Sequence, residues 1–548
     1  MKIKSIAAAI GACLAILSPA TTCARDLDAL QKEFLSWKFG MFIHFNMSTF
    51  VPGGWSTGRE DPMKFNPEDL DIGQWADAAK SAHMKYAVLT VKHTGGWCLW
   101  PSDTTEHNVS LFKNYRGGKG DVVREFVDAF RSRDLKVGFY YCFPLWGKSW
   151  QNYMTLPHKD YATGKIDALG LIKAQFKELL TRYGKIDVVW IDQSTTPNGG
   201  VKPGDWLKVK NYIHELQPGC MVIANNATEL ARSDVLGYEY PYSLKLPKPD
   251  NTIPSEVCDK LNAGWFANPN GAAVPVRSAD YIVNKMLMPM IHRNSNYLLN
   301  CSPEHTGKLH PETVARLKEI GAMWDPEHPD QYDKDLYGMQ TSAVAKIPHK
   351  DKQIALCFER GMPGDVRDRV LEILAKHSAK ATFFLDDNHN LAELKKLVDA
   401  GHSLGNGSKA DKPITDETAM KIRDFISRVQ GKLNRIKTPI TVHFPKGAKQ
   451  SWNLWTALNY FQLTLVDPGF TIDSDTDAGK LAEKLASGDI VMVRNTGETA
   501  VKLEEFLKSA EARGLKVDSL RNTLRTSTSR RLRAMVNGAG AKVETGRE

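Results

Sequence analysis

The feature that most constrains the fold of this chain is an alternation of short apolar runs with amphipathic stretches, which begins near residue 30. The apolar runs are typical of buried strands: FGMFIHF, YAVLTVKH, KVGFYYC, DVVWID and CMVIANN. Amphipathic stretches such as EDLDIGQWADAAKSAHM separate several of them and indicate helices. Repeated strand and helix units over about 300 residues favour a closed, (β/α)8-like barrel, which we place at residues 25–345.

A second alternation follows the polar connector DPEHPDQYDKDLYGMQ. Its strand-like runs are QIALCFER, ATFFLD, ITVHFPKG, FQLTLVD and DIVMVRN, with helical stretches such as DETAMKIRDFISRVQGKLNRI between them. This pattern predicts a second α/β domain at residues 350–520. The low density of glycine and proline at the seam indicates docked domains.

The N-terminal segment has the composition of a signal peptide, predicted at residues 1–24. Two lysines precede an apolar core from Ile6 to Leu17, and a Ser-Pro break and small residues follow it before Arg25. We therefore expect export to the periplasm or the extracellular space, with an anchor on Cys23 as the less favoured alternative. The apolar core is too short for a permanent membrane span.

The formal charge of +9 depends strongly on the last 28 residues, which hold seven Lys/Arg and two Asp/Glu. We interpret residues 521–548 as a basic, disordered tail, with a polyanion-binding arm as the alternative, and we predict no nucleic-acid function. Six cysteines follow the predicted signal peptide, widely dispersed and without a CxxC or Cys/His cluster. No structural zinc is therefore expected, and their pairing stays open.

One acidic residue has a position that suggests catalysis. In RYGKIDVVWIDQSTTPNGG, Asp192 closes a run, Ile186 to Ile191, that is apolar except for Asp187. The carboxyl ends of barrel strands form the active-site mouth, so Asp192 is a catalytic candidate. The alternative is a solvated strand end or a helix N-cap.

Longer blocks of the first domain carry a family pattern, in order from about residue 30 to 330: WKFGMFIHFNMSTFVPGGW, FNPEDLDIGQWADAAKSAHMKYAVLTVKHTGGWCLWPS, VGFYYC, ELLTRYGKIDVVWIDQ and NSNYLLNCSPEHTGKLHPETVARLKEIGAMW. Together they resemble the α-L-fucosidase family of glycoside hydrolases. The resemblance implies an exo-acting, retaining enzyme that removes terminal α-L-fucose from glycoconjugates or polysaccharides. It implies a carbohydrate as substrate and partner, and no cofactor or metal.

The resemblance also implies catalytic roles. Asp192 matches the family's nucleophile, and Glu239 in ARSDVLGYEYPY matches the segment that carries the acid/base, with Glu256 in NTIPSEVCDKLNAGWF as the runner-up. A retaining glycosidase needs two carboxyl groups about 5 to 5.5 Å apart, and the acid must hold its proton near neutral pH.

The sugar-binding positions match the family incompletely. His44 matches the fucose-binding histidine, and His93 matches the first of the family's histidine pair. The second of that pair is Thr94 here, and the usual following aspartate is Gly95, so the glycone is fucose or a relative of fucose. Three aromatic residues fit positions in the wall of a sugar site or in contact with its hydroxyls, or else ordinary core positions: Trp55, Tyr141 and Trp190.

The second domain contains ATFFLDDNHNLAELKKLVDAGHSLGNGSKAD, which resembles the NodB-type polysaccharide deacetylases and implies a distorted β/α barrel. The family's metal ligands are replaced. Glu359 and Arg360 stand at the Asp-Asp pair, Gly407 and Asp411 at the two histidines, and Arg494 at a later histidine. Glycine offers no ligand and arginine repels a cation, so we expect the fold without metal chemistry.

Two other functions compete with glycoside hydrolysis. The chain could be a non-catalytic carbohydrate-binding protein on degenerate enzyme folds, which Thr94 favours, as does Ala227 where the family often has an arginine. It could also be a polysaccharide deacetylase, against which the missing ligands argue. The oligomeric state is not predicted.

Overall fold

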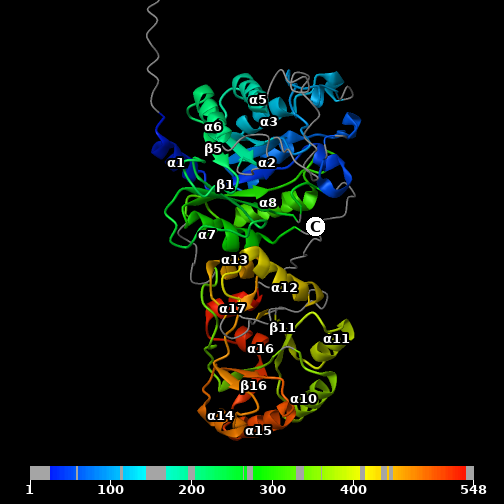
Figure 1. Ribbon diagram of the computed structural model, residues 1–548, viewed down its shortest axis with the longest axis vertical. Helices are drawn as coiled ribbons and strands as arrows, with labels where there is room; N and C mark the ends of the chain where they lie inside the picture. Colours follow the sequence, from blue (N-terminus) through cyan, green and yellow to red (C-terminus); the bar gives the residue numbers. More distant parts are fainter. Residues whose placement is uncertain are drawn as a thin grey trace, which may run out of the picture.

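The computed structural model describes residues 25–537 except 57, 59, 112–114, 144–167, 195–203, 263, 268–275, 329–337, 360, 408–413, 434–440 and 443–447. The predicted signal peptide therefore lies outside the described residues. Two domains are stacked along the long axis of the molecule (Figure 1). Among the described residues, no helix has the length and apolarity that a membrane crossing requires. The six cysteines after residue 25 are all buried and unpaired.

The first domain contains an eight-stranded parallel sheet with the order β5-β4-β3-β2-β1-β8-β7-β6. The strands are β1 (Phe39–Ile43), β2 (Tyr86–Lys92), β3 (Lys136–Cys142), β4 (Val188–Asp192), β5 (Met221–Ala224), β6 (Leu236–Glu239), β7 (Ser255–Lys260) and β8 (Ser295–Asn300). The sheet is nearly closed, which confirms the predicted (β/α)8-like barrel. Its seam lies between β5 and β6, where individual bonds such as Gly237 N to Ala227 O (3.2 Å) replace a ladder.

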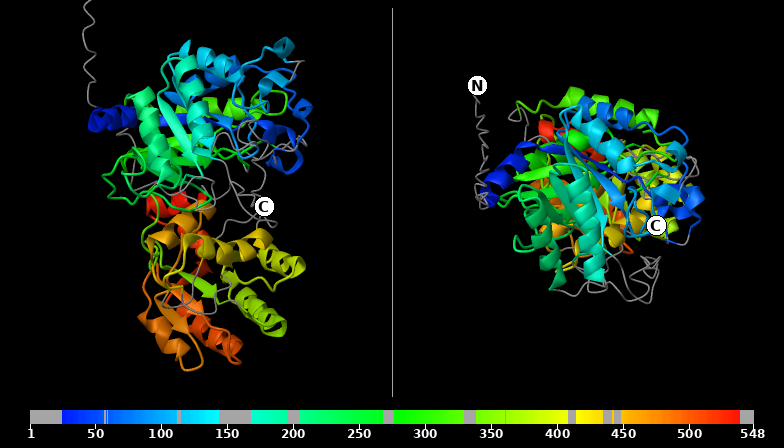
Figure 2. Two further views of the ribbon diagram at one scale, coloured as in Figure 1. Left: turned by 45° about the horizontal axis from the view of Figure 1, so that its top comes forward. Right: turned by 90° about the horizontal axis from the view of Figure 1, so that it is seen from above.

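Helices surround these strands (Figure 2). They are α2 (Ile72–Ser81), α3 (Val122–Arg131), α5 (Ala168–Arg182), α6 (Asp205–Leu216), α7 (Met288–Ile291), which a π-helical segment (Tyr281–Leu287) precedes, and α8 (Pro311–Met323). In α3 the apolar side chains recur at helical spacing on one buried face, and Asp121 caps its first turn by accepting from the backbone N–H of Arg124. Such helices bury one face against the barrel.

The barrel interior is filled by alternate side chains of the strands, including Phe42, Tyr86, Tyr140 and Trp190. A Cβ atom at Gly40 would lie 2.4 Å from the Tyr86 ring, so a glycine is required beside it. Helix α1 (Leu27–Ser36) lies against the N-terminal end of the barrel. Its Phe34 ring is 5.8 Å from the ring of Tyr86, so α1 closes the end of the barrel where β2 begins.

The second domain is built on another eight-stranded parallel sheet, ordered β13-β12-β11-β10-β9-β15-β14, with β16 paired to β9. Its strands are β9 (Gln353–Phe358), β10 (Thr382–Leu385), β11 (Ser403–Asn406), β12 (Thr441–Val442), β13 (Thr464–Leu465), β14 (Phe470–Ile472), β15 (Ile490–Val493) and β16 (Lys516–Ser519). Its helices are α10 (Gly364–Lys376), α11 (Leu391–Asp399), α12 (Ala419–Leu433), α13 (Trp452–Phe461), α14 (Ala478–Lys484), α15 (Thr499–Ala512), α16 (Leu520–Arg525) and α17 (Arg530–Asn537).

The prediction of a disordered tail from residue 521 is wrong for residues 521–537, which lie mostly in α16 and α17. Leu524, Leu532 and Val536 are buried in a core cluster with Ile347. Arginines dominate the charge of these two helices, but a few apolar side chains suffice to dock them. Residues 538–548 lie outside the described residues.

Candidate active site

Polar side chains collect at the carboxyl ends of the first barrel's strands. Because the strands are parallel, these ends all face the same way. Among the polar residues that end a strand are Asp192, Glu239, Lys260 and Asn300. His44, His93 and Asn225 directly follow a strand, and Asn226 is the next residue after Asn225. The barrel thus brings together residues that are more than 250 positions apart in sequence.

Two carboxylates share one amide group. The Asn225 Nδ2 atom donates to Asp192 Oδ1 at 3.0 Å and to Glu239 Oε2 at 2.8 Å. These two oxygens are therefore at most about 6 Å apart, which is compatible with the roughly 5 to 5.5 Å separation in retaining glycosidases. The structure places two of the predicted catalytic residues side by side.

The Asp192 carboxylate is held by donors on both oxygens. The Tyr140 hydroxyl donates to Oδ2 at 2.8 Å, and the backbone N–H of Gln193 donates to Oδ1 at 2.8 Å, in addition to Asn225. These bonds fix the orientation of the group, as a nucleophile requires.

Glu239 has the properties of a proton donor. Burial and the neighbouring charge of Asp192 raise its pKa to about 7, although hydrogen bonds from Asn225 and Asn226 oppose the shift. The Glu239 backbone N–H donates to Asn226 Oδ1 at 3.3 Å, which also ties the end of β6 to the loop after β5. A carboxyl group that keeps its proton near neutral pH can act as a general acid.

The structure does not bring Glu256 to this site. It is the second residue of β7, only 1% exposed, and its carboxyl accepts from Tyr86 Oη at 2.5 Å and from Trp190 Nε1 at 2.9 Å inside the barrel. Burial raises its pKa to about 7 as well. Of the two predicted acid/base candidates, only Glu239 lies beside Asp192.

Two buried histidines are neutral at physiological pH. Burial lowers the pKa of His93 to about 3, and burial together with the neighbouring His93 ring lowers the pKa of His44 well below its usual value. His44 Nδ1 lies 2.8 Å from Asn300 Oδ1, and the Asn300 amide nitrogen donates to Trp265 O at 2.8 Å. That second bond orients the amide, so His44 Nδ1 carries the proton and Nε2 is left as an acceptor.

Aromatic rings surround the two histidines. Trp265 and Phe266 lie 4.9 and 5.2 Å from the His44 ring, and Phe266 lies 4.9 Å from His93. Trp55 lies 5.3 Å from His93 and is 51% exposed, as expected for a residue at the rim of the site. Together these rings offer an apolar wall for the C–H face of a sugar.

Two of the predicted wall residues are elsewhere. Tyr141 points away from the site: its hydroxyl donates to Gln175 Oε1 at 2.5 Å and accepts from Lys92 Nζ at 2.9 Å. Successive side chains on a strand face opposite sides, so its neighbour Tyr140 is the one that reaches Asp192. Trp190 is buried in the barrel, stacked 5.4 Å from Tyr140, and so lies beneath the site.

The unusual Gly95 has a local explanation. A Cβ atom at this position would lie 2.0 Å from Ser56 Oγ, so Ser56 occupies the space that a longer side chain would need. Ser56 Oγ in turn donates to Glu60 Oε2 at 2.9 Å. Thr94 Oγ1 lies 3.1 Å from His93 Nδ1 and thereby orients that ring.

Sequence reasoning missed seven residues of this site: Tyr140, Asn225, Asn226, Lys260, Trp265, Phe266 and Asn300. Tyr140 and Asn225 lie within the predicted strands KVGFYYC and CMVIANN, so the strand-end rule that selected Asp192 could have found them. Burial raises the pKa of Glu239 and lowers that of His44; the positive charge of Lys260 opposes the first shift and adds to the second. Its Nζ lies 5.7 Å from the Trp265 ring, which places a cation at the rim.

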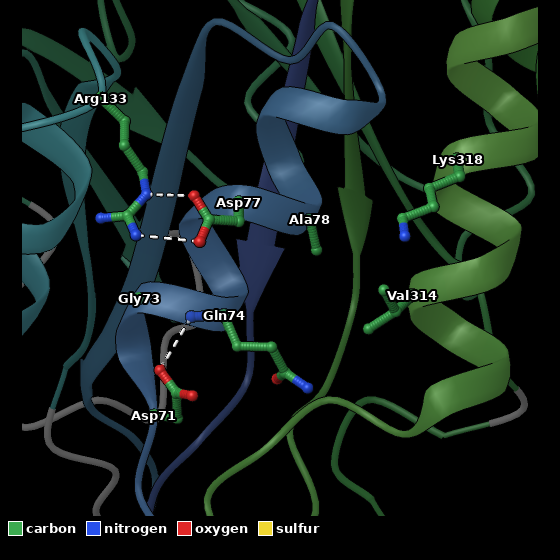
Figure 3. A pocket seen from close by; sticks show the side chains of 8 residues that line it. All are labelled: Asp71, Gly73, Gln74, Asp77, Ala78, Arg133, Val314 and Lys318. Carbon is green, nitrogen blue, oxygen red and sulfur yellow. Dashed lines mark hydrogen bonds and ion pairs between the residues drawn. The ribbon is translucent and has the colours of Figure 1, made fainter.

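A separate pocket of about 310 Å³ lies on the outside of the barrel, between α2 and α8 (Figure 3). Its Asp77 and Arg133 form an ion pair, and Asp71 caps α2 by accepting from Gln74 N at 2.9 Å. The pocket is therefore not part of the strand-end site.

No group of three or more His, Cys, Asp or Glu side chains in the described part of the chain could hold a metal ion. In the second domain, Arg494 directly follows β15 and Gly407 directly follows β11. Arg360 and Asp411 lie outside the described residues. The absence of metal chemistry in this domain stays a prediction.

Comparison with known proteins adds two family matches. The family model described as Alpha-L-fucosidase matches residues 59–325, and the model described as Polysaccharide deacetylase matches residues 346–466. The chain is similar to Alpha-L-fucosidase 1 of Arabidopsis thaliana, with 29% identity over 53% of this chain and 59% of the relative. It is also similar to Plasma alpha-L-fucosidase of Rattus norvegicus, with 30% identity over 58% of this chain and 74% of the relative.

Among solved structures, the chain is similar to Alpha-L-fucosidase isoenzyme 1 from Paenibacillus thiaminolyticus, with 27% identity, a TM-score of 0.43, and coverage of 59% of this chain and 80% of that chain. The chain spans 59% and 57% of the lengths of the relatives from Arabidopsis thaliana and Oryza sativa.

Proposed function

The chain belongs to the α-L-fucosidase family, and on that premise we propose that it is a retaining exo-glycosidase that hydrolyses terminal α-L-fucose from glycoconjugates or polysaccharides. The single observation that carries this proposal is the Asn225 amide, which bonds to both Asp192 and Glu239. It holds the Asp192 carboxyl group and the Glu239 carboxyl group, whose pKa is raised, within about 6 Å of each other, which is compatible with the roughly 5 to 5.5 Å spacing of double displacement.

In the first step, an Asp192 oxygen forms a bond to the anomeric carbon while the bond from that carbon to the leaving oxygen breaks. Glu239 gives its proton to that oxygen, and the aglycone leaves as an alcohol. In the second step, Glu239 takes a proton from water, the water oxygen attacks the anomeric carbon, and Asp192 is released as a carboxylate. The product keeps the anomeric configuration of the substrate.

The electrostatics of the pair favour this change of role. The charge of Asp192 is one cause of the raised pKa of Glu239. That charge disappears when Asp192 becomes bonded to the sugar, so the pKa of Glu239 falls and its carboxylate form is favoured when a base is needed.

Neutral His44 and His93 provide hydrogen-bonding nitrogens for sugar hydroxyls, and Trp265 and Phe266 provide the apolar surface that a 6-deoxy sugar needs for its methyl group. The predicted signal peptide supports export, so the substrates are glycans outside the cytoplasm. In this proposal the second domain holds no catalytic metal.

The test is hydrolysis of an aryl α-L-fucoside by the full chain, with the Asp192→Ala variant beside it and the aryl α-L-galactoside as a parallel substrate. We expect release from the fucoside that is lost in the variant, with slower release from the galactoside because its extra hydroxyl meets the apolar wall. Binding of fucose without hydrolysis would instead support a carbohydrate-binding protein. Preference for the galactoside would assign a different glycone.

A further inference from the structure

Helix α13 of the second domain lies against the first domain (Figure 1). Its Trp452 Nε1 atom donates to the carbonyl of Leu246 at 2.9 Å. Two turns later, the edge of the Tyr460 ring meets the Tyr240 ring, with centroids 6.1 Å apart and planes at 78°. These two aromatic side chains come from one face of α13, since they are eight residues apart.

Both contacts fall on the connection between β6 and β7, residues 240–254. Tyr240 directly follows Glu239, is fully buried, and its backbone N–H donates to Cys258 O at 2.9 Å. Leu246 lies further along the same connection. The second domain therefore touches the segment that begins at the proposed proton donor.

Charged groups of the first domain extend this interface. The Arg293 guanidinium lies 5.3 Å from the Trp452 ring and donates to Pro247 O at 3.2 Å. The Arg277 guanidinium lies 5.9 Å from the Tyr460 ring and donates to both oxygens of Asp259 at 3.0 and 2.8 Å. Helix α13 thus packs on arginines that hold the β6–β7 connection and the end of β7.

We infer that α13 is a positioning element for Glu239, so that the second domain serves the active site of the first without chemistry of its own. The inference rests on the proposed function. Strand β6 needs such support because it borders the seam of the barrel, where no ladder joins it to β5. A displacement of about 1 Å at a reacting group can cost a hundredfold in rate.

The test uses the full chain with Trp452→Phe, which removes one N–H donor, and Tyr460→Leu, which removes the ring. The matched control is Leu458→Val, a buried position on the opposite face of the same helix. Two quantities are measured: hydrogen exchange of the backbone amides of residues 236–246, and kcat/KM for aryl α-L-fucosides with good and poor leaving groups.

We expect exchange in residues 236–246 to accelerate about tenfold in both variants and not in the control, the factor that corresponds to one lost hydrogen bond in Trp452→Phe and one lost aromatic pair in Tyr460→Leu. We expect kcat/KM to fall about tenfold for poor leaving groups and to change less than about twofold for good ones, which need little acid assistance. In a Glu239→Ala background, Tyr460→Leu should cause no further loss, since both changes act through one group.

Unchanged exchange in residues 236–246 would overturn the inference whether or not the chain hydrolyses any fucoside. Equal losses for good and poor leaving groups would also overturn it, because they would show a general loss of structure. A wild type without activity would refute the proposed function alone, and the exchange measurement would still decide whether α13 holds the segment.

Discussion

Burial raises the pKa of two glutamates of the first barrel to about 7, but only the one at the strand ends also has a charged neighbour that raises it, and this difference separates the strand-end region from the barrel interior. Glu239 lies at the strand ends, where burial and the charge of Asp192 raise its pKa to about 7. Glu256 lies in the interior, where burial alone raises its pKa to about 7 against two hydrogen bonds. A perturbed pKa therefore does not identify a catalytic acid unless a reacting partner lies beside it.

The largest expected effect separates the two regions most clearly. Asp192→Ala should lower kcat for aryl α-L-fucosides by about 10⁴-fold or more, because no covalent intermediate can form. The same substitution should lower the pKa of Glu239 and leave that of Glu256 unchanged, since only Glu239 lies next to Asp192. Carboxyl titration by NMR of wild type and variant measures both values, and a shift at Glu256 would contradict the separation.

Glu239→Ala should lower kcat/KM by about 10²- to 10⁴-fold for substrates with poor leaving groups and far less for activated aryl fucosides. In wild type, kcat/KM should fall as the pH rises through about 7, because Glu239 must be protonated in the free enzyme. A pH profile in both proteins checks this. If Glu256→Ala shows the leaving-group dependence and Glu239→Ala does not, the assignment is wrong.

The adjacent tyrosines of β3 test the boundary between the two sides of the strand. Tyr140→Phe removes a donor to Asp192 and should lower kcat about tenfold. Tyr141→Phe should change kcat by less than about twofold but reduce the free energy of unfolding by about 1 to 3 kcal/mol, because buried Lys92 and Gln175 lose a partner. Kinetics and urea unfolding of both variants distinguish these outcomes.

The smallest effect on activity is expected for Glu256→Gln. The pKa of Glu256 is raised above its unfolded value, so this group stabilises the fold below about pH 4.5 and loses that contribution as the pH rises through about 7. The glutamine mimics the protonated acid, so the variant should be more stable than wild type at pH 8, by up to about 3 kcal/mol. Equal unfolding free energies at pH 8 would show that Glu256 is not a buried acid.

The sequence predicts the barrel and the second sheet well because strand and helix periodicity are local properties. Asp192 and Glu239 are identifiable because each ends an apolar run or matches a family segment. It is harder to predict which face of the sheet a side chain lies on. In KVGFYYC both tyrosines suit a half-buried strand, and only the pairing register decides that Tyr140 faces the site. Glu256 is ambiguous for a similar reason, since SEVCDK does not reveal where β7 begins relative to the carboxyl group.

Other features depend on distant partners and are absent from local patterns. From the sequence, Gly95 is a position where a sugar ligand has been lost. Only the structure shows that Ser56 occupies the space that a longer side chain at this position would need. The sequence after residue 520 has the composition of a charged tail, and only the structure shows that Leu524 and Val536 pack in the core. In each case, the deciding contact joins residues far apart in the chain.

The seam between β5 and β6 has a consequence for how this barrel can evolve. Asn225 follows β5 and Glu239 ends β6, so the two residues lie on opposite sides of this seam. The distance between the carboxyl groups of Asp192 and Glu239 therefore depends on a junction of the sheet that has no ladder of hydrogen bonds. Insertions there can widen the gap while every strand pair stays intact. An opening of a few ångströms would reach the roughly 6.5 to 9.5 Å at which water fits between the carboxyls, and the stereochemical outcome would change from retention to inversion.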